Sequence, residues 1–230
     1  MRTASNRFGF AMAAMTLAAC GTSLSARAAD KADAESLVTK SRLTIEALAR
    51  DASFAPLKAS LAQARAVLIF PQVLKAGFFL GGAGGSGVLM ARDAATGQWT
   101  GPAFYTMGSA SIGLQAGASS AEMVMVVQSQ KALESLYANK LKLGSDATAA
   151  LGTKGVEKSA GLDADFVVYA KVKGAFAGVS VDGSVLDVRQ QLNAAYYGQA
   201  VVTPVDILVR QSVRNPDATR LQTTMAALAK

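Results

Sequence analysis

Glycine is concentrated in one apolar, almost uncharged segment, residues 75–127, which constrains the fold more than any other feature. Within it, Gly82, Gly84 and Gly87 have the G-x-G-x-x-G spacing of a dinucleotide-binding loop. Such a loop must open a helix, so that the helix N-terminus faces the pyrophosphate. Here the glycines run into the apolar stretch 88–91 and then a polar turn, which is the pattern of a strand and a hairpin. The sequence therefore argues against a nucleotide site.

The many interior glycines favour a sheet that bends sharply. Glycines inside strands mark bulges, bends or places where two backbones approach closely. Apolar runs typical of buried strands cover 66–70, closed by Pro71, and 122–128. A third run covers 166–172, and the Asp-Gly pair at 182–183 predicts a hairpin turn.

Helical periodicity occurs before, between and after these strands. The first helix is predicted from Asp33, and Pro56 either ends it or starts a second short helix. Further helices are predicted at 129–139, at 188–197 with a glycine stop, and from Asn215 onward. The predicted fold class is α+β: a strongly curled, glycine-rich, mainly antiparallel β-sheet or barrel-like sandwich with N-terminal, middle and C-terminal helices in one domain.

Composition argues against several classes of function. Apolar residues make up 51% of the 230 residues and charged residues 17%, which excludes a disordered chain. The formal net charge of +7 is spread too evenly to indicate nucleic-acid binding. Histidine, the commonest general base and metal ligand, is absent, and a single cysteine allows no internal disulfide. No cofactor, metal or nucleic acid is therefore expected.

The remaining residue types form no recognisable catalytic constellation. Ser86 and Ser184 follow glycines, but neither has an identifiable base, and no G-x-S-x-G elbow is present. Asp163 and Asp165 precede a strand and are interpreted as turn residues, with a calcium site as the alternative. No spacing pairs the other acidic candidates, Glu122, Glu134 and Glu157. We therefore expect a protein that is not an enzyme.

The first twenty residues have the pattern of a targeting signal. Arg2 and Arg7 precede an apolar run of about a dozen residues, shorter than the roughly twenty that span a membrane. The run ends in Leu17-Ala18-Ala19-Cys20-Gly21, which resembles a bacterial lipobox. The alternative is an ordinary signal peptide cleaved after Ala28, at an A-x-A site.

The lipobox interpretation divides the chain into three parts. Residues 1–19 form the signal peptide, residues 20–35 a tether, and residues 36–230 a single domain. Cys20 would carry the acyl anchor, and Gly21 after it favours sorting to the outer membrane. The expected location is thus the bacterial cell envelope, as an outer-membrane lipoprotein that faces the periplasm or the surface.

Several separate motifs resemble a known family. They are VLIFP at 67–71, KAGF at 75–78, GGAGGSGVL at 81–89, GLQAGA at 113–118 and KGAFAGVS at 173–180. In this order they resemble the SYLF domain, a lipid-binding domain also called the Ysc84 actin-binding domain. Residues 193–198 resemble its N-x-x-Y-Y-G ending, and the resemblance covers about residues 40–230.

This resemblance implies a function at a membrane surface. Eukaryotic members resemble membrane adaptors that bind phosphoinositides and, in some cases, actin, whereas bacterial members resemble secreted or lipid-anchored single domains. The expected partner is therefore membrane phospholipid, with anionic or phosphoinositide-like headgroups. The alternative is a structural or protein-binding envelope lipoprotein without specific lipid recognition, and the sequence names no protein partner.

The resemblance also implies where lipid would bind. The segment before the sheet, residues 36–64, resembles an amphipathic membrane-contacting element. Its lysine and arginine head groups would contact lipid phosphates, and Leu37, Ile45 and Leu48 would contact acyl chains. In the alternative, these apolar residues pack on the sheet. Trp99 and Tyr105 are expected at the edge of the core, with a headgroup platform as the other option. The candidate lipid-binding residues are Lys40, Arg42, Arg50, Lys58, Arg65 and Lys75.

Overall fold

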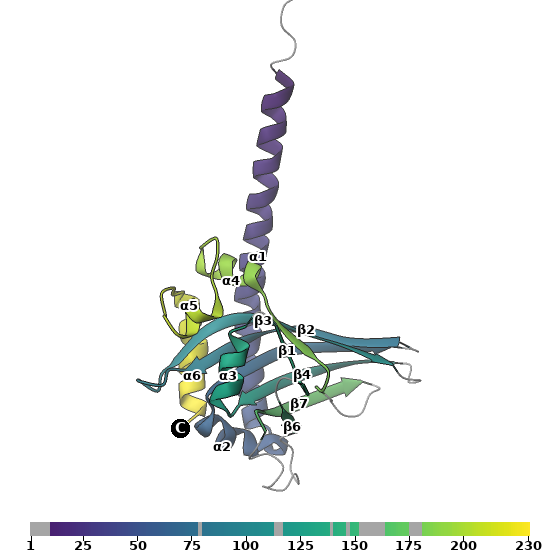
Figure 1. Ribbon diagram of the computed structural model, residues 1–230, viewed down its shortest axis with the longest axis vertical. Helices are drawn as coiled ribbons and strands as arrows, with labels where there is room; N and C mark the ends of the chain where they lie inside the picture. Colours follow the sequence, from purple (N-terminus) through teal and green to yellow (C-terminus); the bar gives the residue numbers. More distant parts are fainter. Residues whose placement is uncertain are drawn as a thin grey trace, which may run out of the picture.

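An open sheet of eight strands forms the centre of the molecule (Figure 1). The computed structural model describes residues 10–77, 80–112, 117–138, 140–145, 148–151, 164–174 and 181–230. The strands are β1 (Ala66–Gly77), β2 (Leu80–Arg92), β3 (Trp99–Ile112), β4 (Gly117–Val127), β5 (Lys140–Lys142), β6 (Ala149–Leu151), β7 (Phe166–Gly174) and β8 (Val185–Val188).

The strands lie side by side in the order β5-β8-β3-β2-β1-β4-β7-β6. All neighbouring pairs are antiparallel except β6 and β7. The predicted α+β class with a mainly antiparallel sheet is therefore confirmed. Within the described residues the two outermost strands, β5 and β6, do not pair with each other, so the sheet stays open instead of closing into a barrel.

Helices cover both faces of this sheet. α1 (Phe10–Arg50) crosses one face and extends well beyond the body of the molecule at its N-terminal end (Figure 1). It contacts η1 (Ala52–Phe54), α2 (Pro56–Gln63), α4 (Gln190–Tyr197) and α6 (Thr219–Leu228). α3 (Gln130–Leu136) lies on the other face, while α5 (Pro204–Leu208) and η2 (Pro216–Ala218) lie between α4 and α6 along the chain.

The start predicted for the first helix is wrong. α1 begins at Phe10 and not near Asp33, because alanine-rich sequence with high helix propensity continues upstream without a break. The residues predicted to form a tether, 20–35, are therefore helical in the full chain. The predicted processing at Cys20 and the domain boundary at residue 36 concern the mature protein and stay predictions.

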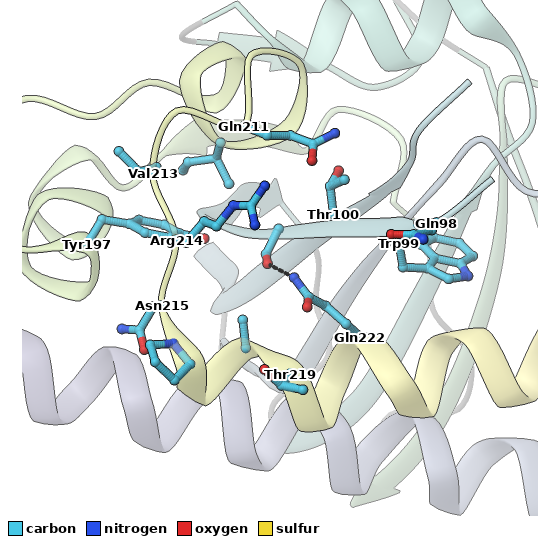
Figure 2. A pocket seen from close by; sticks show the side chains of 14 residues that line it. Gln98, Trp99, Thr100, Tyr197, Gln211, Val213, Arg214, Asn215, Thr219 and Gln222 are labelled. Atoms are coloured by element: carbon cyan, nitrogen blue, oxygen red, sulfur yellow. Dashed lines mark hydrogen bonds between the residues drawn. The ribbon is translucent and has the colours of Figure 1, made fainter. Parts of the chain in front are cut away.

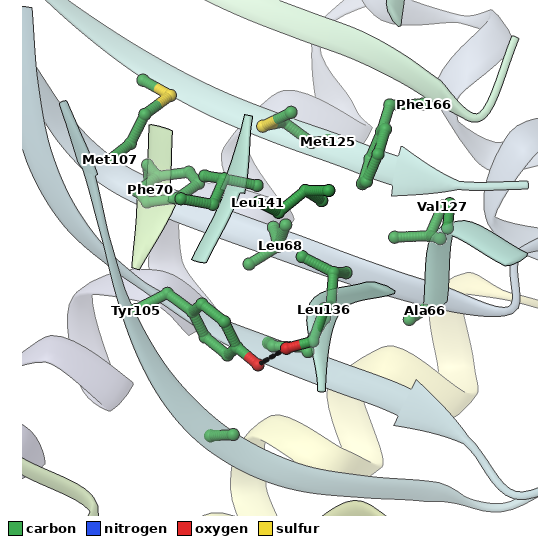
Figure 3. Packing of buried hydrophobic residues seen from close by; sticks show 14 of the residues in the cluster. Ala66, Leu68, Phe70, Tyr105, Met107, Met125, Val127, Leu136, Leu141 and Phe166 are labelled. Carbon is green, nitrogen blue, oxygen red and sulfur yellow. Dashed lines mark hydrogen bonds between the residues drawn. The ribbon is translucent and has the colours of Figure 1, made fainter. Parts of the chain in front are cut away.

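Burial on both faces explains the uninterrupted apolar run at the start of β1. Successive side chains of a strand point to opposite faces. Leu68 and Phe70 accordingly belong to the cluster on the α3 side, shown in Figure 3, while Val67 and Ile69 belong to the cluster under α1. In the first cluster the Tyr105 hydroxyl donates a hydrogen bond to the Leu136 carbonyl at 2.5 Å, and burial raises the pKa of this hydroxyl.

A β-bulge interrupts β1 after this buried run. Ile69 pairs with Val88 and Gln72 with Ser86, so Phe70 and Pro71 both oppose Gly87. A Cβ atom on Gly87 would lie 2.5 Å from the Ile69 carbonyl oxygen, closer than real contacts allow. The glycine spacing therefore serves backbone approach within a strand, and the predicted strand is confirmed because β2 contains all three glycines. Pro71 does not close the strand as predicted, since the bulge tolerates its missing N–H.

The N-x-x-Y-Y-G ending attaches α4 to β3. The Asn193 side-chain oxygen accepts a 2.9 Å hydrogen bond from the Phe104 backbone N–H, and the Tyr196 ring packs edge-on against Phe104 at 5.1 Å between centroids. The Tyr197 hydroxyl donates to the Pro102 carbonyl at 2.8 Å. Gly198 ends the helix in the left-handed conformation (φ 70°). The predicted helix and its glycine stop are confirmed, and the two tyrosines close the helix against the sheet.

The other predicted helices are present with recognisable caps. The Ser129 side chain accepts from the Ala132 N–H to open α3, and the Asn215 side chain accepts from the Asp217 N–H to open η2, which leads into α6. Gly183 adopts a left-handed turn (φ 77°) immediately before β8, as the predicted hairpin requires. Residues 113–116 and 175–180, which carry parts of two family motifs, lie outside the described residues.

Candidate functional site

A groove of about 370 Å³ lies where the sheet extends past α1. We term it the lysine groove. It is lined by Lys40, Leu43 and Thr44 from α1, Pro71 and Gln72 from β1, Ser120 and Glu122 from β4, and Lys171 and Lys173 from β7. Four elements that are distant in sequence thus meet in one concave surface, and the β1 bulge contributes part of its floor.

Strand alternation explains why these side chains face the groove. On β7, Val167 and Tyr169 belong to the apolar cluster under α1, and Lys171 and Lys173 continue the same face two and four residues later. On β4, Val124 and Val126 belong to that cluster, and the same alternation continues outward through Glu122 and Ser120. Each strand therefore changes from apolar to polar side chains where α1 stops covering the sheet.

The charge in the groove is mainly positive, with three lysines and one glutamate. Among the described residues, Lys40 and Lys173 have no hydrogen-bond or ion-pair partner. Lys171 Nζ lies 2.9 Å from Asp51 Oδ2 beyond the groove's edge. The hydrogen bond from Lys171 lowers the pKa of Asp51 to about 2, and the same bond raises the pKa of Lys171. Two lysines are thus available to an anionic ligand, and a third is already oriented.

Two exposed leucines accompany the lysines. Leu43 lines the groove and is 51% exposed, and Leu74 is 55% exposed. Leu74 pairs with Ser120 across β1 and β4, which places it on the face that carries the groove. An apolar side chain beside an uncompensated cation is the arrangement expected where a protein meets the boundary between lipid headgroups and acyl chains.

The structure brings only one of the predicted lipid-binding residues, Lys40, into this groove. Arg42 and Arg50 instead lie 2.7 Å and 3.8 Å from the Glu46 carboxylate, which also accepts a hydrogen bond from Thr224 of α6 at 3.1 Å. Burial raises the pKa of Glu46, but the hydrogen bonds from Arg42 and Thr224 outweigh it and the pKa is lowered. These arginines therefore take part in a network that joins α1 to α6.

The other three predicted residues lie elsewhere. Lys58 is exposed on α2, and Arg65 is exposed just before β1, at the end of that strand away from the groove. Lys75 follows Leu74 on β1, so alternation places it on the opposite face of the sheet. Sequence reasoning missed Lys171 and Lys173. Their two-residue spacing indicated a shared face, but only the pairing of β7 with β4 brings that face next to α1.

The expected core positions of two aromatic residues are confirmed. Trp99 is 6% exposed, with the Arg92 guanidinium stacked 5.1 Å from its ring centroid, and Tyr105 is 1% exposed. Leu48 and Ile45 of α1 are fully buried against the sheet, as the packing alternative proposed, whereas Leu37 is only partly buried. Neither aromatic ring is available as a platform for a headgroup.

The candidate catalytic residues have structural partners. The Ser86 hydroxyl accepts a 3.0 Å hydrogen bond from Arg189, and Ser184 is buried in the turn before β8. Asp165 accepts bonds from Ser129 Oγ at 2.6 Å and from the Thr148 N–H at 3.0 Å, as a turn residue does. Within the described part of the chain, no three His, Cys, Asp or Glu side chains lie close enough to hold a metal ion. Glu157 and Asp163 lie outside it.

None of the described helices combines the length and the apolar character needed to cross a membrane.

Comparison with known proteins consistently points to one protein family. The Ysc84 family, described as "Las17-binding protein actin regulator", matches residues 108–228. LAS seventeen-binding protein 3 of Saccharomyces cerevisiae is 35% identical over 133 residues, which is 55% of this chain and 29% of that protein.

Vertebrate relatives match a longer part of the chain. SH3 domain-containing YSC84-like protein 1 of Xenopus laevis is 32% identical over 165 residues, which is 70% of this chain and 48% of that protein. The Homo sapiens protein of the same name is 32% identical over 163 residues, 69% of this chain and 47% of that protein. The chain thus spans less than half the length of these relatives. No solved structure matches it.

Proposed function

Since the chain belongs to the Ysc84 family, we propose that it is a binding protein whose domain recognises anionic phospholipid at a membrane surface through the lysine groove. The observation that carries this proposal is the juxtaposition of Lys40, Lys171 and Lys173 with the exposed Leu43 and Leu74. The lysines would contact headgroup phosphates, and the leucines would enter the layer between headgroups and acyl chains.

The energy available from this contact is modest but measurable. Each basic residue near an anionic membrane contributes about 1 kcal/mol, so loss of two lysines should weaken binding about 30-fold. Screening by salt should reduce the affinity further, because the headgroup contact is exposed to solvent. Weak binding by the domain alone also fits a protein that a covalent lipid would hold at the membrane.

Co-sedimentation with phosphatidylserine-containing vesicles at low salt tests the lipid proposal. The parent protein carries Cys20→Ser, so that no acyl chain contributes. We expect the pair Lys40→Gln/Lys173→Gln to bind about 30-fold more weakly than this parent. The matched control, Lys58→Gln/Arg65→Gln, removes the same charge outside the groove and should bind like the parent. Equal losses of vesicle affinity in both double variants would refute the groove as the binding site. A parent protein that binds no anionic vesicles would refute lipid recognition.

We also propose that Cys20 carries the acyl anchor of a bacterial envelope lipoprotein. Mass spectrometry of the protein extracted from membranes tests this proposal. A mature N-terminus at Cys20 with an added diacylglycerol mass would support the anchor. A mature N-terminus at Ala29 without added lipid would instead support the ordinary signal peptide cleaved after Ala28.

Binding of a protein partner is the second candidate, because the matched family is described by its binding to Las17 and its regulation of actin. Because the chain spans less than half the length of the yeast and vertebrate relatives, this proposal names no specific partner. A stoichiometric partner recovered from envelope extracts, together with absent vesicle binding, would favour this function over lipid recognition.

A further inference from the structure

A second cleft, of about 460 Å³, lies between the start of β3 and the C-terminal segment of the chain (Figure 2). We term it the C-terminal cleft. Its walls come from Gln98 and the start of β3, from Gln211 and residues 213–216 after α5, and from the first turn of α6, with Tyr197 and Ile207 completing the lining. Its volume falls in the range of sites that hold small molecules. None of its lining residues belongs to the lysine groove.

The only charged side chain among the described residues that line this cleft is Arg214. Figure 2 shows its guanidinium projecting into the middle of the cleft. Arg214 has no hydrogen-bond or ion-pair partner in the described part of the chain. Two carboxylates of this region have other partners, since Asp93 accepts from Gln211 at 2.9 Å and Asp206 pairs with Arg210 at 2.9 Å. A planar guanidinium without a counterion favours a carboxylate or phosphate group.

The amides around Arg214 define the rest of the ligand. Gln222 Nε2 donates to the Gly101 carbonyl at 2.9 Å, and Gln211 Nε2 donates to Asp93 Oδ2 at 2.9 Å. These bonds fix the N–H sides of both amides against the protein and leave their Oε1 atoms as acceptors. The cleft therefore combines one cation for an anionic group with fixed acceptors for hydroxyl donors.

Backbone strain occurs at the same place. Gln211 is the only residue other than glycine with positive φ (51°) in the described part of the chain. A long side chain in the left-handed region is disfavoured, and such residues tend to lie at binding sites whose geometry they fix. Here the strained backbone directs the Gln211 amide between Asp93 and the cleft.

We propose that the C-terminal cleft binds a small carboxylate that carries several hydroxyl groups, the chemistry of a sugar acid. The carboxylate pairs with Arg214, and the hydroxyls donate to the oxygens of Gln211 and Gln222. The apolar wall formed by Val213 and Ile207 limits the ligand's size and excludes water from one side. The site is independent of lipid binding.

Fluorescence of Trp99, the chain's single tryptophan and a cleft residue, gives a direct readout, supported by calorimetry. The probes are D-glucuronate, D-glucose, acetate and inorganic phosphate, added to the full chain. We expect D-glucuronate to bind in the micromolar to millimolar range, and the other three at least tenfold more weakly. Arg214→Gln should weaken glucuronate binding at least tenfold. Arg220→Gln removes the same charge from the exposed side of α6 and should change nothing.

Four results would overturn the proposal. They are no response to glucuronate at saturating concentration, equal affinity for glucose, equal affinity for phosphate, or equal losses in Arg214→Gln and Arg220→Gln. Gln211→Gly gives an independent measurement, since it removes the acceptor and relieves the left-handed backbone at once. It should lower glucuronate affinity while leaving the melting temperature unchanged or higher, and unchanged affinity would contradict the assigned role of Gln211.

Discussion

The two halves of β1 belong to the same strand but have opposite surroundings. From Ala66 to Phe70 every side chain is fully buried, because helices cover both faces of the sheet. Beyond the bulge, from Gln72 to Gly77, only Val73 is buried, and the α1-side face carries Gln72, Leu74 and Ala76. The inner half is thus held by side-chain packing, and the outer half mainly by its backbone ladder with β2 and β4.

This difference separates stability from function along one strand. Packing supplies most of the free energy of folding, so the outer half can leave Leu74 exposed at little cost. The bulge at Phe70 and Pro71 is the boundary, and the lysine groove begins there. Mutations on the two sides of the bulge should therefore affect different properties.

The largest expected difference is between two leucines of β1. Leu68→Ala removes a fully buried side chain and should lower the free energy of unfolding by about 3 kcal/mol. Leu74→Ala removes a side chain that is 55% exposed and should lower it by less than about 0.5 kcal/mol, while weakening vesicle binding. Urea unfolding and vesicle co-sedimentation measure the two effects. Similar losses of stability would show that the outer half is packed as tightly as the inner half.

A second comparison tests the boundary itself. A Cβ on Gly87 would lie 2.5 Å from the Ile69 carbonyl oxygen and 2.6 Å from the Phe70 ring, so Gly87→Ala must move the bulge. We expect it to lower the free energy of unfolding by about 2 kcal/mol. Gly108→Ala on β3 meets no atom within 4 Å and should be neutral or slightly stabilising, since alanine loses less backbone entropy. An equal cost at both glycines, measured by urea unfolding, would mean that close approach is not the reason for Gly87.

The contrast between the two halves also explains what the sequence could predict. Local sequence patterns, such as the apolar run 66–70, predict the inner half, and its strands and flanking helices were predicted correctly except for the start of α1. The open edges of the sheet were not predicted, because closure of a sheet into a barrel depends on which distant strands pair. The continuation of β1 past Pro71 was also missed, since a bulge needs a partner strand to accommodate the unpaired residue.

The candidate site was harder to predict, because it is assembled from four elements. Lys40 was identified from the helix, but its neighbours Lys171 and Lys173 lie about 130 residues later and meet it only through the β4–β7 pairing. Arg42 and Arg50 looked equivalent to Lys40 in sequence, yet Glu46 pairs with both. No sequence pattern indicated a binding role for Arg214, because the cleft around this loop arginine exists only in the folded structure.

The smallest expected effect concerns the ion pair at the edge of the groove. Asp51, the N-cap of η1, and Lys171 on β7 form a surface pair, which contributes little to stability. Because the pKa of Asp51 is lowered from 3.8 to about 2 in the folded state, the pair stabilises the fold above pH 4, and this contribution is lost as the pH falls through about 2. Asp51→Asn should therefore flatten the fall in unfolding free energy between these values, measured by urea titration at each pH. Lys171→Gln should flatten it only in part, because Asp51 also accepts a 3.0 Å hydrogen bond from the Ser53 N–H, which lowers its pKa too. The double variant should match Asp51→Asn, because the titrating carboxylate is absent from both. A fall as steep in Lys171→Gln as in the parent protein would mean that Lys171 does not lower the pKa of Asp51, and that the pair does not hold Lys171 at the edge of the groove.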